Sequence, residues 1–577
     1  MGKFLATQNS FALGEISPEF FARGDKFSAA GLSRLENMDV LASGAITRRR
    51  GLLRITDIPS DAILIPFTYR DDEAYLLAMS DGHIRIFKDD AFVQDLMSPF
   101  TAADIKSVQY AQRFDTMIFT HPNHIPAVLQ KNSNSFELRD FAFSANDDMS
   151  VNIPFMRFDD SRGVKLTVTP SAKGNSFATV TAGAPIWNAS NVGGRLLFLG
   201  KQWVVSDYVS PTVAIAYTNG GYTTPSAPLS DWREAAFSAR RGYPRSITFH
   251  QDRLVFGGSR DWPCGVWLSK TGDHMNFDVG TGLDDEAIFI TLLSDRQQQI
   301  ATVVSSNNLQ ILTTVGEWAI TAKPLTPSVV DIRQHTSVGS LANAYLPPQQ
   351  VEGQTVFVAK NGREIRELVL DSLAENYSAV DLCALSSHLM KNPQSIAYCD
   401  SRNQILVAQA DGSCAVLTKN SALGISAWGA YKTQGRFNSV AVVKDEIYVT
   451  VRRDNGTFIE KFSDDAATDS DGFGFAHSAE SMPAMYSGHN PKKLRLLKLS
   501  ARVLDTKSLF FRIGDKTFRA PLPNEIYANQ TPGFSGDTEI SLLGTTTDTI
   551  DPLWRITGSE PLPCTVLSVT AEGRYSI

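Results

Sequence analysis

Residues 403–417, Asn-Gln-Ile-Leu-Val-Ala-Gln-Ala-Asp-Gly-Ser-Cys-Ala-Val-Leu, contain the pattern that decides the fold. A polar residue opens an apolar and β-branched run, Asp411-Gly412 interrupts it, and a second run follows. Asp-Gly is a preferred centre of a two-residue hairpin, because both turn positions need positive φ. Asp81-Gly82 and Asn361-Gly362 repeat the arrangement. Helical periodicity is scarce, and only 102–112 and 381–390 are expected to carry short helices.

The opening of this pattern recurs along most of the chain. A polar residue followed by three to five apolar or β-branched residues stands at Asp72, Asp115, Asp252, Asn308, Gln354, Asn403 and Asp445. Five of the six spacings are 43, 56, 46, 49 and 42 residues, close to the roughly 40–50 residues of one four-stranded propeller blade. The sequence therefore predicts an all-β protein with a β-propeller of six or seven blades. Evenly spaced hairpins in a β-sandwich are the alternative.

The one long spacing, 137 residues between Asp115 and Asp252, predicts a small β domain inserted in the propeller. An acidic, glycine-bearing stretch over 464–474 marks a second boundary, and the residues after it alternate polar and apolar side chains. The expected divisions are an extended N-terminal arm over 1–55, first propeller blades over 56–150, an inserted β domain over 151–245, remaining blades over 246–462 and a C-terminal β domain over 463–577.

Composition excludes several classes of protein. The chain has 54 Lys and Arg against 61 Asp and Glu, a net charge of −7. This argues against a dedicated nucleic-acid binder, although not against a surface that DNA slides past. No apolar run of about 18 residues is present, so no membrane-spanning helix is expected, and the first ten residues lack the apolar stretch of a secretory signal. The five cysteines have no paired spacing, which favours free thiols.

Two stretches invite an enzymatic interpretation. Ser269–Phe277 resembles the Asp-box hairpin of sialidases, a structural motif outside their active sites. Asp284-Asp285-Glu286 is acidic, but adjacent residues on a strand point to opposite faces, so we interpret it as a solvated turn. We therefore predict no catalytic residue and no cofactor.

Metal-binding signals are weak as well. His121 and His124 flank a Pro-Asn turn, and we interpret them as ordinary loop histidines. Asp469-Ser-Asp471-Gly472 opens like a calcium loop but lacks the glutamate that such a loop needs at its end. We predict no metal site.

Candidate interface residues lie near the N-terminus. Few apolar runs and the presence of Pro18 suggest an arm that lies across its own propeller or a neighbouring subunit, anchored by Phe20 and Phe21. Arg23 belongs to the same arm. The basic run Arg48, Arg49 and Arg50 is interpreted as a salt-bridged docking surface rather than a phosphate contact, given the acidic chain around it.

Several stretches follow one another in an order that matches a known family. They are Asn9–Pro18 (NSFALGEISP), Arg23-Gly-Asp25, Gly31-Leu32, Leu35-Glu-Asn37 and Gly44–Gly51 (GAITRRRG). This succession resembles the opening of the nozzle proteins of short-tailed bacteriophages, also called tail tubular protein B. Further matches lie at 109–115, 120–122, 242–245, 250–256, 267–273, 314–318 and 427–428, and the resemblance ends near residue 460. Arg50 stands where this family frequently has proline, and the C-terminal part matches poorly.

The resemblance implies a structural subunit rather than an enzyme. It implies a homo-oligomer, a hexamer that forms a ring or tube below the portal and the head-to-tail adaptor protein. DNA would be ejected through the lumen without sequence-specific binding, and tail fibres or spikes would attach to the outside. The expected location is the virion tail, after assembly in the host cytoplasm. A lumen lined by acidic loops would repel DNA phosphates. The alternative function is a tail-associated β-propeller enzyme that degrades glycans.

Overall fold

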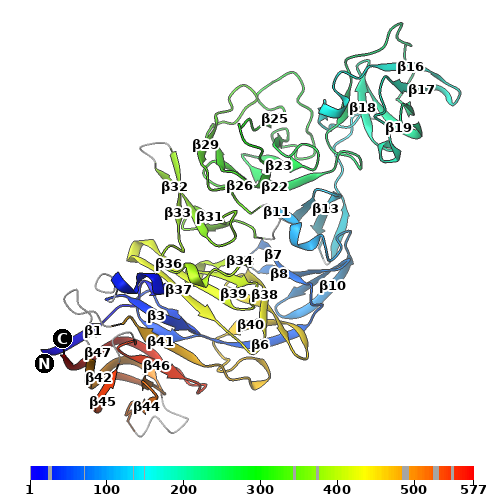
Figure 1. Ribbon diagram of the computed structural model, residues 1–577. Helices are drawn as coiled ribbons and strands as arrows, with labels where there is room; N and C mark the ends of the chain where they lie inside the picture. Colours follow the sequence, from blue (N-terminus) through cyan, green and yellow to red (C-terminus); the bar gives the residue numbers. More distant parts are fainter. Residues whose placement is uncertain are drawn as a thin grey trace.

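The chain folds into a β-propeller with one β domain inserted in it and another at its C-terminal side (Figure 1). The computed structural model describes residues 2–23, 27, 29–70, 72–133, 135–148, 150–341, 346–371, 376–483, 493–523, 532–547 and 551–576. No helix of these residues has the length and apolar character needed to cross a lipid bilayer. The prediction of an all-β propeller is confirmed.

Within the described residues, six antiparallel four-stranded sheets and the first four strands of a ten-stranded sheet form seven blades. Blades one and two contain β7 (Ile63–Arg70), β8 (Glu73–Ser80), β9 (His83–Lys88) and β10 (Ala91–Met97), then β11 (Gln109–Arg113), β12 (Thr116–His121), β13 (His124–Lys131) and β14 (Phe136–Asp140). Blades three and four contain β22 (Pro244–His250), β23 (Arg253–Ser259), β24 (Gly265–Leu268) and β25 (Ile288–Thr291), then β26 (Ile300–Ser305), β27 (Leu309–Thr313), β28 (Glu317–Ile320) and β29 (Ile332–Thr336).

The last three blades complete the ring. Blade five contains β30 (Gln349–Val351), β31 (Gln354–Val358), β32 (Ile365–Asp371) and β33 (Asn376–Asp381). Blade six contains β34 (Pro393–Cys399), β35 (Gln404–Gln409), β36 (Cys414–Asn420) and β37 (Ile425–Tyr431). Blade seven combines β38 (Arg436–Val443), β39 (Glu446–Arg453) and β40 (Gly456–Ser463) with the N-terminal strand β6 (Gly51–Asp57).

The three predicted turns connect neighbouring strands, but only Asp81-Gly82 is a two-residue loop. The loops at Asn361-Gly362 and Asp411-Gly412 span 359–364 and 410–413. Gly82, Gly362 and Gly412 have φ of 68°, 64° and 89°, whereas the preceding Asp or Asn does not have the expected positive φ. The expected helices at 102–112 and 381–390 are reduced to single 3₁₀ turns, η2 (Ile105–Ser107) and η5 (Ser387–Leu389).

Apolar cores between consecutive blades hold the ring together. One core joins Ile65 and Leu77 of blade one to Met117 and Leu129 of blade two. Similar cores lie between each following pair of blades. The ring closes where Leu64 of blade one packs with residues of blade seven. Closure also depends on β6, because the outermost strand of blade seven comes from the other end of the propeller sequence.

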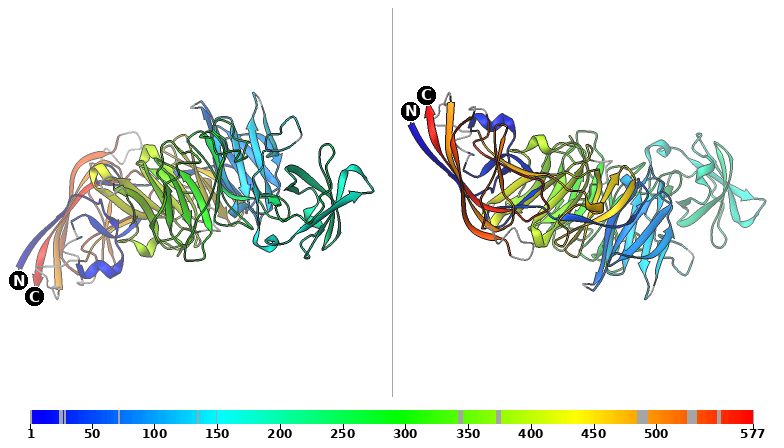
Figure 2. Two further views of the ribbon diagram at one scale, coloured as in Figure 1. Left: turned by 90° about the horizontal axis from the view of Figure 1, so that it is seen from above. Right: turned by 90° about the horizontal axis from the view of Figure 1, so that it is seen from below.

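The inserted domain is a separate sheet between blades two and three. Its strand order is β15 (Phe155–Met156), β21 (Arg233–Ala235), β18 (Arg195–Phe198), β19 (Lys201–Ser210), β20 (Val213–Tyr217), β17 (Gly174–Ala182) and β16 (Leu166–Ser171). The buried indoles of Trp187, Trp203 and Trp232 fill its core. It projects from the propeller at the end opposite the two chain termini (Figure 2).

The N-terminal segment differs from the expected extended arm, because it supplies strands to the C-terminal domain. A sheet there contains β1 (Gly2–Gln8), β4 (Met38–Val40), β5 (Ile46–Arg48), β42 (Lys493–Thr506), β45 (Phe534–Thr547) and β47 (Thr565–Ser576). Apolar residues of the N-terminal segment, among them Phe4, Phe11 and Leu35, are buried together with Leu494 and Leu499 of β42. They are scattered singly along the sequence, so no apolar run indicates their burial.

A second set of strands extends blade six into the same domain. Beyond β37 the sheet continues with β2 (Gly14–Glu15), β3 (Gly31–Glu36), β41 (His477–Ser481), β46 (Arg555–Gly558), β43 (Phe510–Ile513) and β44 (Lys516–Arg519). Since β2 and β3 run parallel to β37, the N-terminal segment joins the propeller to the C-terminal domain.

Candidate functional site

The basic run lies at the junction of the N-terminal segment, blade seven and the acidic loop. Arg49 is 1% exposed and makes five hydrogen bonds. Its two terminal nitrogens each donate to a carboxylate oxygen of Asp469 at 2.9 Å, and Nε donates to Asn37 Oδ1 at 2.9 Å. The remaining two bonds go to the carbonyls of Arg50 and Lys432. All five N–H groups of the guanidinium are thereby satisfied inside the molecule.

The neighbouring arginines are partly buried. Arg48 donates to Ala467 O at 2.8 Å and its guanidinium carbon lies 3.9 Å from the ring centre of Phe475. Burial, reinforced by the charge of Arg49, lowers the pKa of Arg48 to about 10. Arg50 donates to Phe462 O at 3.3 Å. The predicted salt-bridged character is present, but it is internal, so the assignment of Arg49 to an interface with another molecule is wrong.

The acidic loop, residues 464–474, supplies carboxylates that pair with side chains at this junction. Asp469 also accepts a hydrogen bond from Thr433 Oγ1 at 2.7 Å, Asp471 pairs with Arg54, and Asp464 lies 3.0 Å from Arg402. Arg49, Arg54 and the hydroxyl of Thr433 thus bind the carboxylates of Asp469 and Asp471 in the calcium-like stretch. Because the Asp469 oxygens point to Arg49, they are not available as calcium ligands.

The aromatic pair Phe20 and Phe21 contacts its own chain. Both lie in η1 (Pro18–Arg23), are half-buried, and pack on a small core of Ile16, Phe27 and Met482. The ring centres of Phe20 and Phe27 are 6.1 Å apart in an edge-to-face arrangement. The side chain of Arg23 lies outside the described part of the chain. The Phe pair therefore anchors the N-terminal segment to its own molecule.

Residues of the GEIS stretch, Gly14–Ser17, form the contact with blade six. Gly14 has φ of +61°, and a Cβ there would lie 2.5 Å from the backbone N and O of Trp428. Glu15 accepts a hydrogen bond from Leu35 N at 2.7 Å, and its other oxygen lies 2.7 Å from His388 Nε2. A glycine is required where two backbones approach this closely.

The enzymatic candidates are structural elements of blade three. The buried guanidinium of Arg253 donates to the carbonyls of Ser269, Asp284 and Glu286 at 2.6–2.8 Å. The carboxylate of Glu286 accepts backbone N–H groups of the turn that precedes it, and these bonds lower its pKa. The Asp-box-like stretch and the acidic triplet both lie in the connection between β24 and β25, and these hydrogen bonds hold that connection in place.

The axis of the propeller contains a cavity of about 340 Å³, lined by β11, β22, β26 and the start of β30. Gln109 of β11 donates to Ala301 O of β26 at 2.6 Å, although the two strands belong to blades two and four. Inner strands two blades apart are therefore within reach of one side chain. The lining of the cavity is uncharged, with glutamine, serine and threonine among the polar residues.

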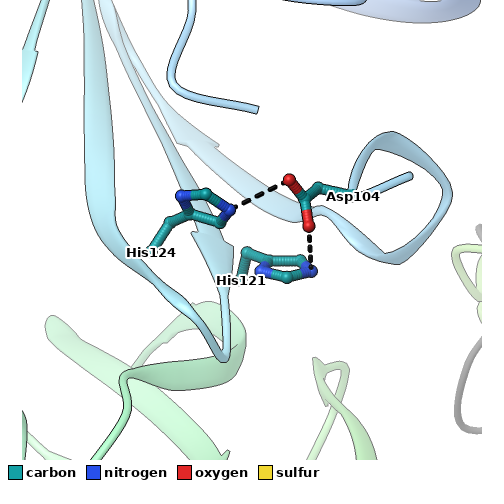
Figure 3. Close-up of side chains that lie close together, drawn as sticks. All are labelled: Asp104, His121 and His124. Carbon is teal, nitrogen blue, oxygen red and sulfur yellow. Dashed lines mark hydrogen bonds and ion pairs between the residues drawn. The ribbon is translucent and has the colours of Figure 1, made fainter. Parts of the chain in front are cut away.

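The two histidines lie together with an aspartate that the sequence did not single out (Figure 3). Asp104 Oδ2 is 3.0 Å from His124 Nε2, and Asp104 Oδ1 is 3.6 Å from His121 Nε2. Burial lowers the pKa of His121 to about 4, so its ring is neutral at pH 7. Asp104 comes 17 residues before His121 in a segment expected to be helical, so no spacing signal connects it to the histidines.

Comparisons with known proteins bear on the fold. No family model and no curated protein matches the chain. Among solved structures, the RRP9 WD40 repeats match with 7% identity, 72% of this chain, 99% of that chain and a TM-score of 0.38. BamB from Moraxella catarrhalis matches with 11% identity, 72% and 98% coverage and a TM-score of 0.34. The designed Ika8 protein matches with 11% identity, 70% and 98% coverage and a TM-score of 0.33. These values carry nothing about activity or partners.

Proposed function

We propose that this chain is the structural subunit of the tail nozzle of a short-tailed bacteriophage. In this proposal several copies, six by the family resemblance, form a ring below the portal and the head-to-tail adaptor. DNA is ejected through the ring, and tail fibres or spikes attach to it. The chain acts as a building block and not as an enzyme.

One observation carries the proposal. Some stretches that resemble nozzle proteins contact one another, although they are far apart in the sequence. At the junction of the N-terminal segment with blade six, Gly14 abuts Trp428. Thr120 Oγ1 donates to Arg245 O at 3.2 Å, which joins two further matching stretches. A resemblance that rests on fold-determining contacts supports shared architecture better than scattered surface matches.

The geometry of the propeller bears on where DNA would pass. Gln109 of β11 donates to Ala301 O of β26, so a side chain closes the space between the inner strands of blades two and four. In this proposal the DNA passage is formed between subunits and not through one propeller. This requires a heterologous interface that closes a ring.

The decisive experiment examines the assembly directly. The chain is mixed with the portal and head-to-tail adaptor proteins of the proposed phage, and the products are examined by mass photometry and electron microscopy. We expect a ring of identical subunits on the adaptor, and a central channel without a continuous Lys/Arg lining. A chain that stays monomeric and ignores the adaptor, yet releases reducing sugar from host polysaccharide, would overturn the proposal in favour of the glycan-degrading alternative.

A further inference from the structure

A side-chain cluster in blade two has the composition of a metal site. His121 is the last residue of β12, His124 is the first of β13, and Asp104 lies in the turn before η2. One nitrogen from each histidine and one carboxylate oxygen all lie within 4.8 Å of one another. The three side chains point toward a common centre from two segments of the chain (Figure 3).

The position of His121 is an independent observation that points to a ligand. Its side chain is 6% exposed, and its Nε2 is aimed at Asp104 Oδ1 from 3.6 Å, beyond hydrogen-bonding distance. A nearly buried ring that aims a nitrogen at a carboxylate without a hydrogen bond is positioned to bind an ion together with that carboxylate.

We propose that Asp104, His121 and His124 bind a Zn²⁺ ion, with water in the fourth position. Imidazole and carboxylate are ligands that Zn²⁺ accepts at about 2.0–2.2 Å, which in a tetrahedron sets the ligand atoms about 3.4 Å apart. His124 Nε2 lies 3.0 Å from Asp104 Oδ2 and His121 Nε2 lies 3.6 Å from Asp104 Oδ1. All three ligand atoms lie within 4.8 Å of one another, so small side-chain shifts would bring them around one ion. His124 is 26% exposed on its side chain, which leaves an entry for the ion.

Binding requires a change of tautomer at His121. Its Nδ1 now accepts a hydrogen bond from Asn123 N at 3.3 Å, which leaves the ring proton on Nε2. Coordination through Nε2 moves that proton to Nδ1 and breaks this hydrogen bond. His124 Nε2, which donates to Asp104 Oδ2 at 3.0 Å, likewise gives up its proton and that bond. Two new metal–imidazole bonds and one metal–carboxylate bond replace them.

The ion would fix the 101–107 turn to the hairpin of blade two. Asp104 holds the 101–107 turn through hydrogen bonds from Thr101 N and Oγ1 at 3.0 and 2.7 Å. The histidine hairpin in turn accepts a bond from Tyr243 N at Pro122 O, at 2.9 Å, where the chain enters blade three. A metal at this position therefore pins the turn of blade two to the hairpin that meets blade three.

The test uses the full-length chain after removal of metals with a chelator. Zn²⁺ alone is titrated by calorimetry, and Co²⁺ is added in its place to read the visible spectrum of a tetrahedral site. We expect one Zn²⁺ per chain and a higher unfolding temperature in its presence. His124→Gln and Asp104→Asn each weaken binding at least about tenfold, because even outer partners of metal ligands account for 10- to 100-fold.

His83→Gln is the matched control. His83 also lies 3.1 Å from an aspartate, Asp95, and both belong to blade one. Among the described residues, no third histidine, cysteine or carboxylate lies close enough to share an ion with that pair. This variant should bind Zn²⁺ like the wild type. Absence of stoichiometric binding overturns the proposal, as does binding that survives both His124→Gln and Asp104→Asn in chains with wild-type circular dichroism. A control that loses binding overturns it too.

Discussion

Arg49 and His477 are both buried polar side chains, but their surroundings offer them different hydrogen-bond partners. The guanidinium of Arg49 donates hydrogen bonds to Asp469 and three other acceptors. The ring of His477 is 4% exposed, and its Nδ1 has no hydrogen-bond partner in the described structure. Burial, with a smaller effect of Arg48, lowers the pKa of His477 to about 4. A buried charge persists only where it is paired.

Arg49→Met should destabilise the protein by about 3–5 kcal/mol, because it leaves Asp469 buried without a counter-charge. The midpoint of urea unfolding measures this loss. Arg157→Met is the matched control, since Arg157 pairs with Asp231 while both are mostly exposed, and it should cost less than about 1 kcal/mol. Adding Asp469→Leu to Arg49→Met should recover part of the loss. Equal midpoints for the Arg49 and Arg157 variants would contradict a stabilising role of the buried pair.

His477 makes the fold sensitive to acid. The unfolded chain takes up a proton on this ring below pH 6.5, whereas the folded chain resists until about pH 4. Stability is therefore fully present above pH 6.5 and is lost as the pH falls toward 4, by roughly 2–3 kcal/mol for this group. His477→Gln should flatten that part of the stability profile, measured by unfolding at pH 7 and pH 4.5. An unchanged slope between the two pH values would exclude the effect.

At the scale of elements, the junction between blade six and the C-terminal domain depends on backbones that approach closely. The parallel pairing of β2 with β37 brings Gly14 beside Trp428. The core next to it buries Phe11 against Trp554, with ring centres 6.1 Å apart. Strands from residues near 14, 428 and 554 thus meet in one small region.

Gly14→Ala should weaken this junction by roughly 2–5 kcal/mol, from a strained positive φ and a clash with the Trp428 backbone. Gly424→Ala, on a hairpin of the same blade, isolates the effect of the positive φ. Gly424 has φ of +66° and nothing within 4 Å of a Cβ, so only about 1–2 kcal/mol is expected. Thermal unfolding and limited proteolysis of the N-terminal segment provide the readout. Equal losses of stability in the two variants would show that the clash with the Trp428 backbone contributes nothing.

At the scale of the whole molecule, the propeller lies between the inserted β domain and the C-terminal β domain, and blade six continues into the latter as one sheet (Figures 1 and 2). Closure relies on β6, whose Leu52 pairs with Phe462 in blade seven. The inserted domain leaves and re-enters the ring at one place, since Met156 and Glu234 are partners in adjacent antiparallel strands.

Removal of the inserted domain should leave the ring intact. Replacing 157–233 with a short Gly-Ser linker joins two positions that a strand pair holds about 5 Å apart. We expect a folded chain in which the separate unfolding step of the inserted domain has disappeared, measured by calorimetry and circular dichroism. A chain that no longer folds would indicate that the inserted domain is part of the propeller's folding unit.

The candidate site was only partly predictable. The basic run and the acidic loop were both recognised, but not that Arg49 and Asp469, 420 residues apart in the sequence, form one pair. Asp104 was missed because its relation to His121 and His124 arises from a turn folding back on a hairpin. Ion pairs and ligand sets of this kind have no sequence period, so pattern analysis cannot find them.

The sequence by itself determined the hairpins, the approximate blade length and the position of the inserted domain. A hairpin joins neighbours along the chain, and its turn residues and alternation act locally. Only the tertiary structure decided the blade number, the completion of blade seven by β6, and the pairing of β1 with β47. These contacts join segments hundreds of residues apart, and they form because exposed strand edges and scattered apolar residues are buried together when the ring closes.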